Sequence, residues 1–233
     1  MKKRLAACGI IFLCLGAITF SQTIGKIDYC EGRVQVVRNG RQIGRVAIGF
    51  PIENLDHVTT GRDSLATISF LPDSGITGTL DISTESSAII RRDSLVAGPS
   101  NDVYLLGGSV SLKVKRLSGN NSSMRVRTAS SVLGVRGTEF SAATLSGNTL
   151  VACREGDVFC SPHSSTKGVS AIPGTMVEIL DSGELSTGAF PSGDFYEEWE
   201  SISNRWKTFH VELITADPVS FIDRFVSSWE RSL

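Results

Sequence analysis

Apolar and polar residues alternate along most of the chain with the period of two that half-buried strands require. The clearest example is the run VSLKVK at residues 110–115, in which valine and leucine alternate with serine and lysine. Turn residues such as Asn39-Gly40 interrupt the alternation at short intervals. Residues 22–190 are therefore predicted to form a mainly β domain, either a sandwich or a rolled, solenoid-like sheet.

The period of the apolar positions changes after residue 190 from that of a strand to that of a helix. Large apolar residues recur at steps of three and four, with Asp194 as the N-cap. A second helix is predicted from Asp217-Pro218, so that residues 191–233 form a helical pair. This pair either packs on the β region and closes a sheet edge, or docks a partner protein. The docking alternative would use Phe195, Trp199, Trp206, Phe225 and Trp229.

The chain begins with a basic segment, Met1–Arg4, followed by an apolar run at residues 5–20. The run is shorter than the roughly 20 residues of a membrane-spanning helix. Residues 1–21 are therefore predicted to be a cleaved secretory signal. An uncleaved membrane anchor and lipidation at Cys8 or Cys14 are the alternatives. Each of these alternatives places the following residues outside the cytoplasm.

Charge is nearly balanced over the whole chain, with 23 Lys and Arg against 24 Asp and Glu. This balance argues against a nucleic-acid partner. The charges are segregated, however, because residues 103–138 contain bases and no acid, whereas acids dominate from residue 178 onward. The central bases are either solvated or covered by the acidic helices, or they bind an anionic polymer, a lipid phosphate or an acidic partner. The candidate anion-binding residues are Lys113, Lys115, Arg125 and Arg127, which share strand faces in pairs.

The sequence contains no recognised catalytic or metal-binding motif. It has three histidines, without metal-ligand spacing. Ser164 and Lys167 have the spacing of a serine acyl enzyme, but they lie in a loop rather than on a helix. We therefore predict a protein that is not an enzyme and needs no cofactor or metal. A hairpin turn at Gly156-Asp157 would place Cys153 opposite Cys160; a disulfide and two buried thiols are both open.

Five sequence segments occur in the order that is typical of the FecR-domain family, an extracytoplasmic module of bacterial sigma-factor regulators and secreted envelope proteins. They include VTTGRDSLA at 58–66, LGGSV at 106–110 and VLGVRGTEF at 132–140. The region from 58 to 158 therefore resembles this family. The residues that carry the resemblance are Thr60, Gly61, Ser64, Gly108, Val110, Thr128, Gly134, Arg136, Gly137, Thr138, Phe140, Gly156 and Val158.

The most specific segment has a physical interpretation of its own. Gly134 and Gly137 flank a bend and supply positive φ angles, while Thr138 bonds a turn amide and Phe140 enters the core. Arg136 either holds loop carbonyls or a carboxylate, or binds a ligand.

The resemblance implies a function in regulation. In the family's regulators a cytoplasmic segment that binds a sigma factor precedes a membrane span and the module. Only four residues precede the apolar run here, so we expect no direct sigma-factor binding. We expect a secreted or periplasmic module that binds an envelope protein or polymer or senses a signal. The alternative is a membrane-anchored regulator of a transmembrane signalling or transport system, with envelope enzymes as a third class.

Overall fold

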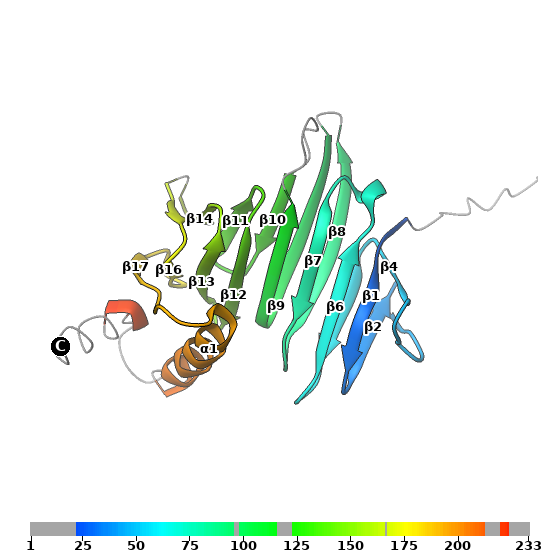
Figure 1. Cartoon of the computed structure of the whole chain (residues 1–233), viewed down its shortest axis with the longest axis horizontal. Coiled ribbons are helices and arrows are strands. Elements are labelled where there is room, and N and C mark those ends of the chain that lie inside the picture. Colours follow the sequence, from blue (N-terminus) through cyan, green and yellow to red (C-terminus); the bar gives the residue numbers. More distant parts are fainter. Residues whose placement is uncertain (1–21, 96–97, 116–122, 166, 213–219, 224–233) are drawn as a thin grey trace, which may run out of the picture.

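Two β-sheets lie face to face and share one long strand (Figure 1). The computed structural model describes residues 22–95, 98–115, 123–165, 167–212 and 220–223. Sheet A has the order β4 (Pro51–Glu53), β1 (Thr23–Glu31), β6 (Leu65–Phe70), β7 (Thr77–Ile82), β9 (Gly98–Lys115), β12 (Glu139–Leu145), β13 (Asn148–Glu155), β16 (Thr175–Ile179), β17 (Leu185–Ala189).

In sheet B, as in sheet A, the shared strand β9 lies in the middle of the strand order. Its order is β3 (Arg41–Gln42), β2 (Val34–Arg38), β5 (Asp56–Thr60), β8 (Ser87–Leu95), β9, β10 (Ser123–Arg127), β11 (Ser131–Val135), β14 (Val158–Pro162), β15 (Val169–Ala171). The strand pairs are antiparallel except for β9 with β10, and a short 3-10 turn, η1 (Pro72–Ser74), precedes β7.

Gly108 allows β9 to pass from sheet B into sheet A. Residues before it pair with β8, and residues after it pair with β7 and β12. Its φ of 85° is a conformation that glycine adopts without strain. A Cβ at this position would lie 2.3 Å from the Ser86 hydroxyl oxygen, so no other residue fits.

The inward-facing apolar residues of both sheets form a single core. The predicted mainly β fold is confirmed, and so is the Asn39-Gly40 hairpin turn between β2 and β3. The solenoid-like alternative is not supported, because the described strands form two facing sheets and not a repeated coil.

Helix α1 (Phe195–Glu212) packs on the outer face of sheet A over β12 and β13 (Figure 1). These strands are buried on both sides: Phe140 and Val151 face sheet B, whereas Ala143 and Leu150 face the helix. The Asp194 carboxylate accepts from the backbone N–H groups of the first turn, as expected of an N-cap. The helix therefore covers a face of the sheet, not the edge that the sequence suggested.

A buried carboxylate on β16 fastens the C-terminal segment to sheet A. Glu178 is fully buried and accepts four hydrogen bonds, from Trp206 Nε1, His210 Nε2, Ser220 Oγ and Ile222 N, at 2.7 to 3.1 Å. Burial raises the pKa of Glu178, but the donors outweigh it and the net pKa is lowered.

Two predicted segments lie largely or wholly outside the described residues. They are the signal at 1–21 and the second helix, of which only the helical turn at Phe221–Asp223 is described. Within the described part of the chain, no helix has the length and apolar character needed to cross a membrane.

Candidate binding groove

The outer face of sheet A carries a row of small polar side chains beside α1, and the row ends at the fully buried Ser141. Thr67, Asp81, Ser111 and Ser141 form one row across β6, β7, β9 and β12. Thr67 donates to Asp81 Oδ1 at 2.7 Å, and the hydroxyls of Ser111 and Ser141 are 2.6 Å apart. This row follows from the period-two alternation of each strand. The residues directly before and after each of these positions point into the core, so the four side chains point outward.

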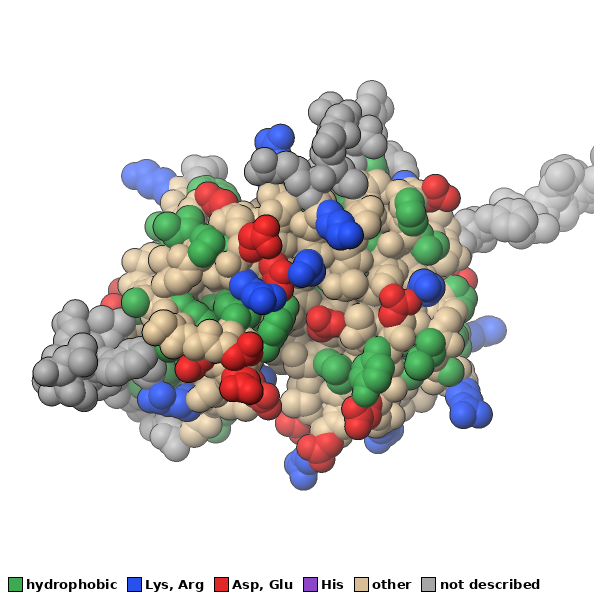
Figure 2. All heavy atoms as spheres, in the orientation of Figure 1, with side chains coloured by type: hydrophobic (Ala, Val, Ile, Leu, Met, Phe, Trp, Pro, Cys, Tyr) green, Lys and Arg blue, Asp and Glu red, His purple; other side chains and the backbone are tan. Residues whose placement is uncertain are grey.

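Helix α1 presents a second, polar stripe beside its apolar face. Tyr196, Glu200, Ser203 and Lys207 recur at steps of three and four residues and face the polar row of sheet A. The two surfaces enclose a groove with a volume of about 550 Å³. In the space-filling view the molecule is hollowed between the helix and the sheet, and acidic side chains gather around the hollow (Figure 2).

Three turns close the far end of the groove. They contribute Glu31 at the end of β1, Asp63 and Ser64 before β6, and Ser83 and Thr84 after β7. Four carboxylates, Glu31, Asp63, Asp81 and Glu200, thus face one ammonium group, that of Lys207. The groove is therefore net negative.

Burial inside the groove shifts two ionisable groups toward their neutral forms. The pKa of Asp81 is raised, chiefly by burial and further by the charge of Glu139, although the Thr67 hydrogen bond opposes this. The pKa of Lys207 is lowered by burial, against the attraction of Glu85. Both shifts follow from removing water around a charge.

Glu139 holds the helix wall of the groove in place. Its carboxylate accepts from Tyr196 OH at 2.5 Å and Lys113 Nζ at 2.8 Å, and from the Arg154 guanidinium, which also lies over the Tyr196 ring. Burial alone would raise the pKa of Glu139, but these donors lower it to about 2. The sequence analysis missed this residue; its signal was a lone acid in the apolar segment 138–145.

The first family segment supports the closed end of the groove. Thr60 Oγ1 accepts from Ser86 N at 3.0 Å, and Gly61 N donates to Arg33 O at 2.9 Å. Ser64 accepts from Arg33 N at 2.8 Å and also lines the groove. The three family residues of this segment therefore fix turns, and of the three only Ser64 lines the groove.

The later family residues are structural as well. Val110, Phe140 and Val158 lie in the core, and Thr128 bonds the hydroxyls of Ser131 and Thr149. Gly137 and Gly156 have φ angles of 63° and 87°, as glycine permits. The prediction of positive φ is wrong for Gly134, which is an extended residue of β11 paired with Arg125 and Phe159.

Thr138 and Arg136, at the bend between β11 and β12, do not make the contacts that the sequence predicted. Thr138 is buried, but within the described part of the chain its hydroxyl bonds no turn amide or other partner. It lines a second cleft of about 560 Å³ together with Lys113, Lys115 and Gly156. Arg136 is exposed, and no carbonyl or carboxylate of the described residues holds it.

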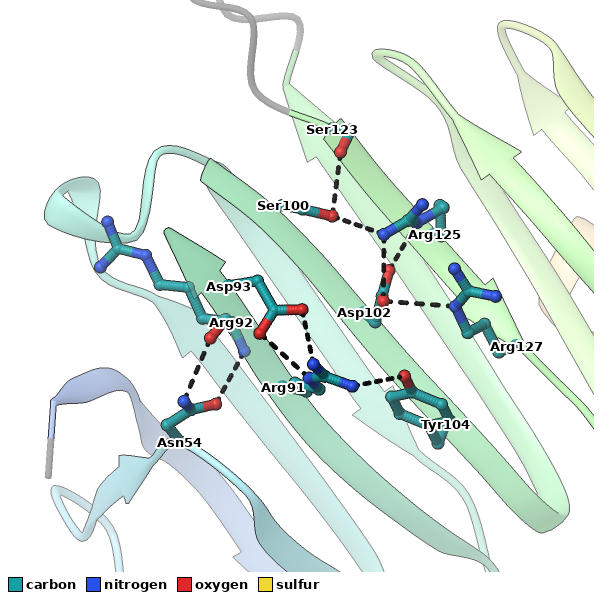
Figure 3. A network of polar contacts seen from close by, with 10 residues as sticks. All are labelled: Asn54, Arg91, Arg92, Asp93, Ser100, Asp102, Tyr104, Ser123, Arg125 and Arg127. Atoms are coloured by element: carbon teal, nitrogen blue, oxygen red, sulfur yellow. Dashed lines mark hydrogen bonds and ion pairs between the residues drawn. The ribbon is translucent and has the colours of Figure 1, made fainter. Parts of the chain in front are cut away.

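The structure does not bring the four candidate anion-binding residues onto one face. Lys113 and Lys115 point outward from sheet A, whereas Arg125 and Arg127 point outward from sheet B. Asp102 on β9 pairs with both arginines, at 2.6 and 3.2 Å (Figure 3). One of the open alternatives was that the acidic helices cover these bases, but the acids that pair with them are Asp102, for the two arginines, and Glu139, for Lys113.

Cys153 and Cys160 are buried free thiols in different sheets. Cys153 pairs with Phe140 on β12, and Cys160 pairs with Leu133 on β11. Gly156-Asp157 is therefore not a hairpin turn that places the two cysteines opposite each other, because the chain crosses between the sheets there. Burial raises the pKa of Cys153 to about 11 and that of Cys160 to about 12.

Three of the five candidate docking residues lie on the side of α1 that faces sheet A. Phe195, Trp199 and Trp206 are buried against the outer face of sheet A, and Trp199 Nε1 donates to Ser109 Oγ at 3.1 Å. Phe225 and Trp229 lie outside the described residues. The described part of the chain also contains no cluster of three His, Cys, Asp or Glu residues that would hold a metal ion.

The fold and the groove define a two-sheet β domain with a helix on one outer face. Residues 56–159 match the model of the family described as FecR protein. This segment is a FecR domain, and the resemblance predicted from the sequence is confirmed. The match includes two of the three turns at the closed end of the groove, those with Ser64 and Thr84, and ends well before α1.

Comparison with solved structures finds two crystal structures of a "putative anti-sigma factor" from Parabacteroides distasonis ATCC 8503. They are 16% and 15% identical to this chain, each with a TM-score of 0.46 over 57% of it. The chain spans 59% of the length of those proteins. Among curated proteins, no match is found.

Proposed function

We propose that this protein is a regulatory signalling component that acts outside the cytoplasm by binding an envelope protein or polymer, without catalysis. The observation that carries the proposal is the FecR domain, to which the chain adds a helix that builds a groove on its surface. The groove is large enough for a ligand, within the roughly 300 to 1,000 Å³ of typical binding sites. A ligand seated there would contact both the FecR domain and α1.

Location outside the cytoplasm is supported by the signal predicted at residues 1–21. We would tag the protein at its C-terminus, express it in a bacterium, separate the cell fractions and determine the N-terminus by mass spectrometry. We expect an N-terminus at Gln22 in the periplasmic or secreted fraction. An intact Met1 in the membrane fraction would select the anchored-regulator alternative, and cytoplasmic protein would overturn both.

The regulatory role is tested by filling the groove. Asn204 is an exposed α1 residue that lines the groove, so Asn204→Trp should block it without disturbing the core. Glu197→Trp adds similar bulk to the same helix outside the groove and is the control. In a deletion strain, we expect wild type and Glu197→Trp, but not Asn204→Trp, to restore the transcripts changed by the deletion. The proposal fails if the deletion changes no transcripts.

A further inference from the structure

The lining of the groove points to a particular chemistry of ligand. Besides Tyr196, six serine and threonine side chains line the groove with hydroxyl groups: Ser64, Ser83, Thr84, Ser109, Ser111 and Ser203. A hydroxyl both donates and accepts a hydrogen bond, and so does each hydroxyl of a sugar. Ser109 accepts from Trp199 and keeps its own proton to donate. Ser64, Thr84 and Ser203 donate their protons to backbone carbonyls, so these hydroxyls present acceptor lone pairs to the groove. A polyhydroxylated ligand supplies the donors that such a lining accepts.

Two carboxylates approach the groove from opposite sides. Asp81 lies on the floor and Glu200 on the helix wall, and neither forms an ion pair with the described residues. Thr67 donates to Oδ1 of Asp81, and no described donor contacts Oδ2. A carboxylate with free lone pairs accepts from neighbouring hydroxyls of one ring. The same charges repel phosphates and other anions.

An aromatic side chain stands at the rim beside these polar groups. Tyr196 is 42% exposed, and its hydroxyl is held by Glu139. An aromatic ring buries the C–H face of a sugar while polar neighbours bond its hydroxyls. The Glu139 contacts and the strands of the floor fix these groups before a ligand arrives, which reduces the entropy cost of binding.

Other ligand classes fit the groove less well. An apolar ligand would find only Leu65 among the side chains of the floor and its turns. A polyamine would benefit from the net negative charge, but it would meet the like charge of Lys207. These mismatches favour an uncharged polar ligand.

We propose that the groove between α1 and sheet A binds a neutral saccharide of one or two sugar rings. The inference rests on the proposed function and names the chemistry of its ligand. Saccharide recognition would connect the FecR domain, which supplies the floor, to the C-terminal helix, which supplies the wall.

The test uses the mature chain, residues 22–233, labelled with ¹⁵N and titrated with maltose, cellobiose and N,N′-diacetylchitobiose, and separately with inorganic phosphate and spermidine. We expect at least one disaccharide, at about 10 mM or below, to shift amide signals around Asp81, Ser111 and Glu200. Phosphate should leave these signals unchanged. The proposal is overturned if no disaccharide shifts the signals, or if spermidine alone does.

Matched variants separate groove binding from binding elsewhere. We expect Asp81→Asn and Glu200→Gln each to weaken disaccharide binding about fivefold or more, which is the loss of one charge-assisted hydrogen bond. Glu197→Gln makes the same change on α1 outside the groove and should bind like wild type. Equal affinity in all four proteins would overturn the site.

Failure of the ligand class and failure of the proposed function remain distinguishable. If no disaccharide binds but Asn204→Trp still abolishes regulation, the saccharide inference falls and the regulatory role stands. If a disaccharide binds in the groove but deletion of the protein changes no transcripts, the saccharide site stands and the regulatory role falls.

Discussion

The two outer faces of the sandwich are built from similar strands, but a helix covers part of one face and no described element covers the other. Over β12, β13 and β16 the outward residues of sheet A are mostly apolar, and α1 covers them. The outward residues of sheet B include Tyr104, Arg125 and Arg127, which form polar contacts with their neighbours (Figure 3). No described element covers this face. Whether a face is covered therefore depends on its outward residues and not on how its strands pair.

The comparison predicts a large difference between the aromatic residues of the two faces. Trp206→Ala should lower the free energy of unfolding by about 3 to 5 kcal/mol, because Trp206 is fully buried between α1 and sheet A. Tyr104→Ala on sheet B should lower it by less than about 1 kcal/mol. Urea unfolding measures both. Similar losses for the two variants would contradict this difference between the two faces.

Substitution of Glu178, the buried carboxylate beneath α1, should have the second-largest effect on the free energy of unfolding. Glu178→Gln should lower the free energy of unfolding by about 2 to 3 kcal/mol. A neutral amide accepts weaker hydrogen bonds than a carboxylate, and an NH₂ donor replaces one of the two carboxylate oxygens that accept them. Glu184→Gln, at an exposed position on the adjoining turn, is the control and should change little.

The same variant predicts a change in pH dependence. The folded pKa of Glu178 is lowered, so its contribution is complete above the unfolded pKa of about 4.3 and is lost as pH falls through the folded value. The melting temperature of Glu178→Gln should therefore fall less below pH about 4 than that of wild type. Parallel melting curves for the two proteins between acidic and neutral pH would contradict this assignment.

A smaller effect is expected on the open face. Asp102 is buried between two arginines, so Asp102→Asn should cost about 1 to 2 kcal/mol. Asp93 pairs with Arg91 in a more exposed position, and Asp93→Asn should cost about 0.5 kcal/mol or less. Denaturant titrations of both variants would compare these pairs. A larger loss for Asp93→Asn would contradict the ranking.

Substitution of Arg136 should have the smallest effect on the free energy of unfolding. Because it is exposed and unpaired within the described residues, Arg136→Ala should change the free energy of unfolding by no more than about 0.5 kcal/mol. Thermal and urea unfolding check this expectation. A loss above about 1 kcal/mol would show that Arg136 stabilises the bend after all, through a contact the described residues do not contain.

Local patterns predicted much of the fold. Alternation indicated β9 around Val110–Lys115, the step pattern and Asp194 indicated α1, and the ordered segments indicated the FecR domain. Predictions that needed a partner distant in sequence were less successful. Cys153 and Cys160 are close in sequence but lie in different sheets, and the acid that neutralises Arg125 is on β9 rather than on a helix.

The groove was not predicted, because its lining has no local signature. Asp81 and Ser111 look like solvated strand residues, and Glu200 and Lys207 look like the exposed face of a helix. They become a site only because α1 packs beside the uncovered half of sheet A. Glu139 likewise has no predicted role within the segment at 132–140, and only the tertiary structure brings Lys113, Arg154 and Tyr196 to it.

The sequence by itself determined the strands, the helix, the family and the segregation of charge, because each follows from neighbours along the chain. The tertiary structure alone decided which acid neutralises which base, which aromatic residues are covered, and where a groove forms. The physical reason is that burial and pairing depend on the packing of elements far apart in sequence. Ser109 and Trp199, 90 residues apart, meet at the groove only after the sandwich and α1 have assembled.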